Sequence, residues 1–231
     1  MLQRLKRLEI GALISLMAVS AAIWAFLALA DEVGEGDSAS IDTRLLLMLR
    51  DPGNPTDPIG PRGFEEAMRD MTALGGVTFL TLVTVIAFVG LMFYRKRRQA
   101  WVFLSVVALA ELSADLLKGV FDRPRPDLVP HGSYVYSFSF PSGHSTMSAV
   151  VFLTLAGLLS SLEPKRRAKA FIFAVAVLLV IAVGFSRVYL GVHWPTDVLG
   201  GWTLGAAWAL VARLALGAWT RPARGAAGVL T

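Results

Sequence analysis

The chain has 231 residues, of which 55% are hydrophobic, and its 22 Lys and Arg outnumber its 17 Asp and Glu, which gives a net charge of +5. Several uncharged runs approach the roughly 20 residues that a helix needs to span a bilayer, so the composition excludes a soluble domain and predicts an integral membrane protein. Cysteine is absent, which excludes disulfides, thiol nucleophiles and cysteine metal sites. Basic residues in a membrane protein report topology first, so we expect no nucleic-acid partner.

Six apolar stretches predict an all-α, polytopic membrane helix bundle that forms a single domain over residues 1–231. The stretches cover residues 10–30, 71–94, 100–117, 143–162, 170–186 and 198–220. The first stretch also has features of a signal peptide, because basic residues precede it and "ALA" ends it before Asp31. Its length exceeds the roughly 7 to 15 residues of a usual signal-peptide core, so we favour a retained transmembrane helix.

Short basic segments predict the orientation of these six helices. They are "QRLKR" near the start, "RKRR" at 95–98, "EPKRRAK" at 163–169 and "RPAR" near the end. The positive-inside rule places all four in the cytoplasm, so both termini are expected inside a multi-pass protein of the cytoplasmic (inner) membrane. Residues 31–70 then form a long extracytoplasmic loop.

The loop of residues 31–70 contains two local patterns. "IDTRLLLMLR" has the apolar spacing of a short amphipathic helix, and "DPGNPTDPIGP" predicts proline-rich turns. Two interpretations stay open: the loop is a solvated cap over the helix ends, or its short helix lies at the membrane interface near a lipid entrance.

Four cations lie at the extracytoplasmic ends of the predicted helices, where short loops usually avoid Lys and Arg. They are Lys118, Arg123, Arg125 and Arg187. A single such residue is typical of a snorkelling anchor, but four at three chain positions predict an anion site. A guanidinium offers a planar fork to two phosphate oxygens, and an ammonium acts as a point charge, so a phosphoryl group fits this set.

Two further clusters lie on the same membrane face. In "PSGH", Ser142, Gly143 and His144 supply a hydroxyl, backbone N–H groups and an imidazole at the start of a helix, which attracts anions. The alternative is an ordinary Ser-Gly helix start. His193 and Asp197 are four residues apart, which puts them on one face if the helix has begun, and Asp197 could then hold the imidazole tautomer. Alternatively, Asp197 stabilises the helix start and His193 is a bystander.

Two patterns within the apolar stretches carry smaller predictions. Asp115 precedes Lys118 by three residues and is expected to neutralise and orient it, with a proton or ion path as the rival interpretation. Gly201 and Gly205 have small-xxx-small spacing, which favours close helix packing over a dimer interface.

Three blocks together resemble the type 2 phosphatidic acid phosphatase family, whose relatives include the vanadium haloperoxidases. The family signature K-x6-R-P, P-S-G-H and S-R-x5-H-x3-D is matched at every position by "KGVFDRPRP" at 118–126, "PSGH" at 141–144 and "SRVYLGVHWPTD" at 186–197. The resemblance implies a helical core in which these blocks form one phosphate pocket, with a histidine nucleophile and no metal or other cofactor.

Carried over by position, the resemblance makes His193 the nucleophile, Asp197 its orienting partner and His144 the general acid. It also implies a set of groups that bind the phosphoryl oxygens: Lys118, Arg125, Ser142, the backbone of Gly143, and Arg187. Arg123 lies outside the strict signature and receives no assigned role.

The resemblance implies a membrane lipid phosphatase whose substrate enters from the bilayer and reacts on the extracytoplasmic, or periplasmic, face. Phosphatidic acid, phosphatidylglycerol phosphate, undecaprenyl diphosphate and lipid A phosphates all carry an anionic head on an apolar body, and the motifs do not choose among them. A lipid-to-lipid phosphotransferase with the same site stays open, and a non-catalytic transporter of anions or lipids is the rival from another class. Protein partners and oligomeric state are not predicted.

Overall fold

The computed structural model describes residues 2–133, 135 and 137–217, with side chains from residue 10 onward. Within these residues the chain forms eight helices and one small antiparallel sheet. The helices are α1 (Leu2–Glu35), α2 (Ala39–Leu47), α3 (Arg62–Ala73), α4 (Val77–Phe93), α5 (Arg97–Phe121), α6 (Gly143–Leu162), α7 (Arg166–Tyr189) and α8 (Pro195–Gly217). The strands are β1 (Arg50–Asp51) and β2 (Asn54–Pro58).

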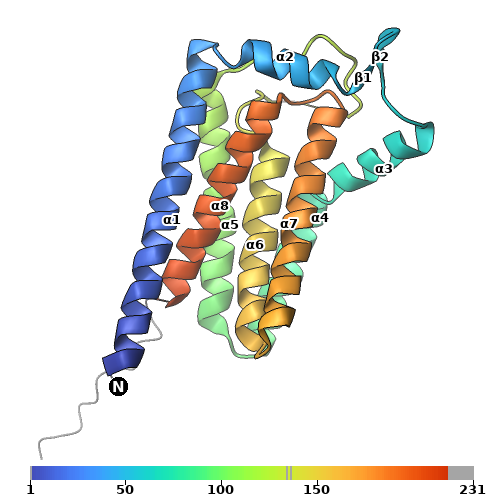
Figure 1. Cartoon of the computed structure of the whole chain (residues 1–231). Coiled ribbons are helices and arrows are strands. Elements are labelled where there is room, and N and C mark those ends of the chain that lie inside the picture. Colours follow the sequence, from blue (N-terminus) through green and yellow to red (C-terminus); the bar gives the residue numbers. More distant parts are fainter. Residues whose placement is uncertain (1, 134, 136, 218–231) are drawn as a thin grey trace, which may run out of the picture.

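The long helices run side by side, and α2 lies across one end of the bundle, which we call the α2 end (Figure 1). Helix α6 is the centre of the bundle, because it packs against α4, α5, α7 and α8. Its Val150 and Val151 are fully buried, together with Phe103 of α5. A helix that is apolar on all sides must be covered by other helices or by lipid, and α6 is covered by the four helices around it.

Five helices are long and apolar enough to cross a membrane, and α3 with α4 forms a sixth candidate span that is bent by 45°. The expected all-α polytopic bundle is therefore confirmed. The predicted start of the second span at residue 71 is wrong, because α4 begins only at Val77. The break has a packing cause: a Cβ on Gly75 would lie 2.4 Å from Val183 Cγ1 and 3.3 Å from His144 Cβ, so this turn approaches the bundle too closely for a side chain.

The segment of residues 31–70 is more structured than its sequence indicates. Helix α1 continues to Glu35, and the stretch expected as proline-rich turns contains the β1–β2 hairpin. Helix α2 contacts α8 and buries Asp42 and Leu46 completely, while its Ile41 and the C-cap residue Met48 stay exposed. The short helix therefore covers the helix ends and keeps an exposed apolar surface.

The two small residues of α8 allow it to approach α6 closely. A Cβ on Gly201 would lie 2.7 Å from the carbonyl oxygen of Ser142, and one on Gly205 would lie 2.5 Å from that of Thr146. Both neighbours are backbone atoms of the same chain, so the small-xxx-small spacing serves packing within the bundle, as predicted.

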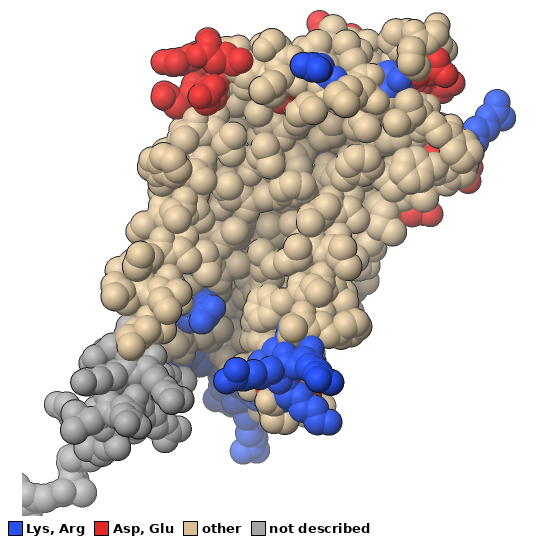
Figure 2. Space-filling view, in the orientation of Figure 1, with Lys and Arg blue, Asp and Glu red and all other residues tan. Residues whose placement is uncertain are grey.

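The charges are distributed unevenly along the bundle. Figure 2 shows Lys and Arg gathered at the end opposite α2, an almost uncharged middle, and groups of Asp and Glu near the α2 end. The short connections α4–α5 and α6–α7 supply basic residues to the first of these ends. An uncharged band between two polar ends is the pattern of a protein embedded in a bilayer.

Candidate active site

The three sequence blocks meet at the α2 end of the bundle. A Cβ on Gly143 would lie 3.1 Å from Lys118 Nζ, so the ammonium group sits against the first turn of α6. The backbone N–H of Ser142 donates to the carbonyl of Asp197 over 3.0 Å. Arg125 Nη1 lies 3.0 Å from His193 Nε2. Residues from three separate connections are thereby brought into one cluster, as the sequence predicted.

Ser142 is the N-cap of α6. Its Oγ accepts from the N–H of Ser145 at 3.5 Å and from the Ser145 hydroxyl at 3.0 Å, and its own side chain is fully buried. The ordinary helix-start interpretation of "PSGH" is therefore realised. The same helix start lies beside Lys118, and a helix N-terminus of this kind stabilises an anion.

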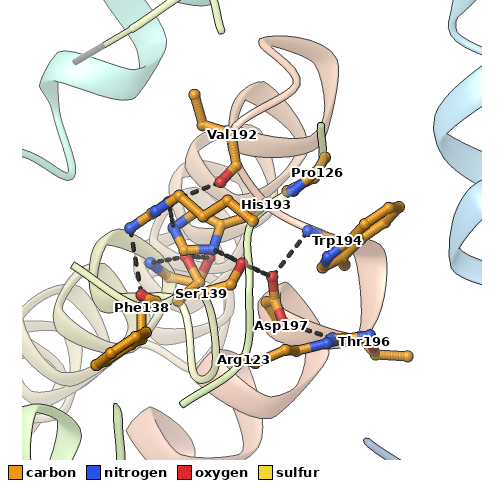
Figure 3. A network of polar contacts seen from close by, with 12 residues as sticks. Arg123, Pro126, Phe138, Ser139, Val192, His193, Trp194, Thr196 and Asp197 are labelled. Atoms are coloured by element: carbon orange, nitrogen blue, oxygen red, sulfur yellow. Dashed lines mark hydrogen bonds and ion pairs between the residues drawn. The ribbon is translucent and has the colours of Figure 1, made fainter. Parts of the chain in front are cut away.

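His193 lies in the turn between α7 and α8, and only 2% of its surface is exposed. Its Nδ1 lies 3.3 Å from Asp197 Oδ2 and 3.4 Å from Ser139 Oγ (Figure 3). Because α8 begins at Pro195, the pair does not share a helical face; the Asp197 carboxylate reaches back instead and also accepts from the N–H of Trp194 at 2.8 Å. Asp197 thus both caps α8 and holds His193.

The partners of His193 fix its tautomer. Arginine only donates hydrogen bonds, so Nε2 beside Arg125 must accept, and a carboxylate only accepts, so Nδ1 beside Asp197 must carry the proton. Burial lowers the pKa of His193 to about 3, although the contact with Asp197 opposes this shift. The ring is therefore neutral near pH 7, with its lone pair on Nε2.

Arg125 is held by the loop around it. Its Nε donates to the carbonyl of Ser137 at 2.7 Å, and its Nη1 donates to that of Val192 at 2.6 Å. Burial lowers the pKa of Arg125, against the attraction of Asp197. An open cavity of about 350 Å³ borders this guanidinium and is lined by Arg125, Val135, Ser137 and Phe138.

The remaining predicted residues surround this centre. Lys118 Nζ donates to Asp115 Oδ1 over 3.3 Å, but Asp115 itself is 61% exposed. Arg187 is buried, and its Nη1 donates to Thr72 Oγ1 at 2.8 Å. The imidazole of His144 is half-buried and makes no hydrogen bond to any described residue. It is close enough to Lys118, Arg125 and Arg187 to interact electrostatically with their positive charges.

Arg123 has a different environment from the other three cations. Its Nη1 donates to Asp197 Oδ1 at 2.6 Å and its Nη2 donates to Asp42 Oδ2 at 2.7 Å. Two carboxylates therefore neutralise this guanidinium, which gives it a place behind Asp197 instead of one facing the cavity. Of the four cations grouped by the sequence, Arg123 is the one that pairs with two carboxylates.

Several site residues were missed by sequence reasoning. The Ser139 hydroxyl donates to Asp197 Oδ2, Thr196 bonds both Arg123 and Asp42, and Thr72 holds Arg187. None of them occupies a specified position of the signature, although Thr196 lies within its third block. The one available signal was Asp42, a single acid within the apolar pattern of residues 41–50. Among the described residues, no group of three or more His, Asp or Glu is arranged to hold a metal ion.

Comparison with known proteins identifies the family. The model of the PAP2 superfamily matches residues 99–221, which include all three signature blocks. The chain is 42% identical over 143 residues to phosphatidylglycerophosphatase B of Bacillus subtilis, covering 61% of this chain and 69% of that protein. It is 31% identical over 121 residues to undecaprenyl-diphosphatase of Sulfolobus acidocaldarius, covering 50% of this chain and 54% of that protein.

A solved structure supports the same assignment. The crystal structure of a transmembrane PAP2 type phosphatidylglycerolphosphate phosphatase from Bacillus subtilis is 33% identical, covers 84% of this chain and 94% of that chain, and has a TM-score of 0.73. The resemblance indicated by the signature is thereby confirmed. The chain belongs to the PAP2 superfamily and is an integral membrane hydrolase of phosphate esters.

Proposed function

We propose that this enzyme hydrolyses a lipid phosphate or diphosphate through a phosphohistidine formed on His193. The observation that carries the proposal is the state of His193: it is neutral and buried, its Nδ1 is held by Asp197, and its Nε2 lone pair lies 3.0 Å from a cation. A fixed neutral imidazole beside a cationic group is the arrangement that nucleophilic attack on an anionic phosphoryl group requires.

In the first step, His193 Nε2 attacks phosphorus in line, and an N–P bond forms as the bond from phosphorus to the lipid oxygen breaks. His144, which the negative charge of the bound phosphate keeps protonated, donates its proton to the departing oxygen. The phosphoryl oxygens replace Nε2 as partners of Arg125, while Asp197 stabilises the positive charge that develops on the His193 ring.

In the second step, water attacks phosphorus and gives a proton to His144, and the N–P electrons return to Nε2. Inorganic phosphate then leaves, and both histidines regain their starting states. Lys118, Arg125, Arg187 and the N–H groups at the start of α6 stabilise the equatorial oxygens in both steps. Each such donor is worth about 10²- to 10³-fold in rate, by comparison with oxyanion holes.

The substrate class we favour first is phosphatidylglycerol phosphate. Both the relative with 42% identity and the solved structure with 33% identity carry this substrate in their names, whereas the undecaprenyl-diphosphatase covers a smaller part of this chain. The proposal also includes orientation: the basic end of the bundle lies in the cytoplasm and the site lies on the extracytoplasmic face. The acyl chains then stay in the bilayer while the headgroup reaches His193.

The test is phosphate release by the purified protein in mild detergent with a chelator present. Phosphatidylglycerol phosphate, phosphatidic acid, undecaprenyl diphosphate and a lipid A phosphate are compared at equal surface concentration, with His193→Asn as the inactive variant. We expect the highest kcat/KM for phosphatidylglycerol phosphate and no release by the variant. A higher kcat/KM for another lipid would correct the substrate, and release by the variant would refute the nucleophile.

A further inference from the structure

Helix α2 contributes a buried carboxylate to the site from outside the region that the family model matches. Asp42 lies between α1 and β1, before residue 99, and its side chain has no exposed surface. A carboxylate is rarely buried completely unless donors or cations compensate for the lost water. The contacts of Asp42 therefore indicate what it does.

Three donors surround Asp42. Its Oδ1 accepts from the backbone N–H of Thr196 at 2.9 Å, and its Oδ2 accepts from the Thr196 hydroxyl at 2.6 Å and from Arg123 Nη2 at 2.7 Å. Thr196 directly precedes Asp197 in the first turn of α8. Asp42 thus fixes the backbone and the side chain of the residue next to Asp197.

Arg123 extends this contact to Asp197 itself. Its Nη1 donates to Thr196 Oγ1 at 2.8 Å and to Asp197 Oδ1 at 2.6 Å, on the carboxylate oxygen that does not face His193 (Figure 3). The ring of Trp194 lies 5.8 Å from the guanidinium carbon and covers the cation. A continuous path of polar contacts therefore runs from Asp42 through Arg123 and Asp197 to His193.

We propose that Asp42 is a positioning residue for catalysis, which acts through Arg123 and Thr196 to hold Asp197 against His193. This inference rests on the proposed function, because it assigns Asp42 to the support of that nucleophile. Asp42 and Asp197 each form an ion pair with Arg123, so the two carboxylates together fix the orientation of its guanidinium. Without Asp42 the cation is free to turn toward Asp197 alone, and the start of α8 loses two hydrogen bonds.

The expected effect is on the chemical step. Removing a partner that orients a metal ligand typically costs about 10- to 100-fold in activity, and we expect a loss of similar size for a partner that orients the carboxylate behind a nucleophile. Because Asp42 does not face the cavity beside Arg125, we expect Asp42→Asn to lower kcat by this factor while KM changes less than about twofold. A residue that only stabilised the fold would instead lower the fraction of active enzyme and leave kcat per folded molecule unchanged.

The experiment measures kcat and KM for phosphatidylglycerol phosphate, with folded protein quantified by size-exclusion chromatography in detergent. Asp37→Asn, in the exposed segment five residues earlier, is the matched control and should keep the wild-type kcat. Thr196→Val removes one link of the path and should lower kcat, whereas Thr196→Ser keeps the hydroxyl and should restore it. This pair tests the path even if Asp42→Asn fails to fold.

A double-mutant cycle with Arg123→Gln decides whether Asp42 acts through the guanidinium. We expect Asp42→Asn to lower kcat by a smaller factor in the Arg123→Gln background than in the wild type, because only the path through Thr196 is left to lose. A folded Asp42→Asn variant with wild-type kcat, or an equal loss of kcat in both backgrounds, would overturn the inference. His193→Asn separates the two proposals. Activity in His193→Asn would refute the nucleophile. If His193→Asn is inactive and Asp42→Asn keeps the wild-type kcat, only the positioning role of Asp42 is refuted.

Discussion

Replacement of Gly201 by alanine tests whether the contact between α6 and α8 sets the geometry of the site. The added Cβ would lie 2.7 Å from the carbonyl oxygen of Ser142, 2.8 Å from Ser145 Cβ and 3.1 Å from the N–H of Thr146. Cβ atoms essentially never approach heavy atoms closer than 3.0 Å, so the helices must separate by a few tenths of an ångström. Overpacking of this kind costs about 1 to 3 kcal/mol.

The start of α6 carries His144 and the start of α8 carries Asp197, so the same displacement moves these two residues relative to each other. A misplacement approaching 1 Å costs about 100-fold in rate, so the smaller shift expected for Gly201→Ala predicts a loss of about 10-fold in kcat. With about 2 to 4 °C per kcal/mol for a chain of this size, the midpoint of thermal unfolding should fall by roughly 2 to 12 °C.

The matched control is Gly157→Ala on α6, where an added Cβ would meet no atom within 4 Å. Alanine exceeds glycine in helix propensity by about 1 kcal/mol, so this variant should unfold at or above the wild-type midpoint and keep its kcat. Both midpoints are measured in the same detergent by intrinsic tryptophan fluorescence. Equal midpoints and equal kcat for the two variants would refute the packing argument.

Three further predictions concern the charged groups. Burial lowers the pKa of His193 from 6.5 to about 3, so below pH 6.5 the unfolded chain binds a proton that the folded chain does not. The midpoint of thermal unfolding of the wild type should therefore fall more steeply between pH 6.5 and 4.5 than that of His193→Asn. Parallel curves of midpoint against pH for the two proteins would contradict this. Arg125→Lys keeps the charge but loses the planar fork, so kcat/KM should drop about 100-fold, and an unchanged kcat/KM would exclude a direct role for the fork. Because Asp115 is 61% exposed, Asp115→Asn should change activity by only about twofold, whereas Lys118→Ala should cost about 100-fold. A large loss of activity in Asp115→Asn would support the predicted role of Asp115 in orienting Lys118.

Local sequence patterns predicted the parts of the site that depend on short spacing. The cluster of Lys118, Arg125, His144 and His193 follows from the three signature blocks, and the apolar stretches bring these blocks to one end of the bundle. The pairing of His193 with Asp197 was also predicted, although its geometry was not, because the sequence did not show that α8 begins only at Pro195.

The features that the sequence did not predict depend on contacts between distant segments. Asp42 meets Thr196 across 154 residues, and Arg187 meets Thr72 across 115 residues. No periodicity connects such positions. The bend between α3 and α4 has the same character, because Gly75 is required by the approach of Val183 and His144, which belong to other helices. Arg123 was grouped with the phosphate-binding cations because its two carboxylate partners were not visible in its own block.

The most direct test of the account is a rapid-quench measurement of phosphate bound to the protein during turnover of a lipid labelled in its terminal phosphate. The wild type should accumulate an acid-labile, base-stable phosphoryl group on the peptide that contains His193. His131→Asn, which alters a histidine outside the proposed chemistry, should accumulate the same group, and His193→Asn should accumulate none. Turnover at the wild-type rate with no protein-bound phosphate, or label that persists in His193→Asn, would contradict a phosphohistidine at this site.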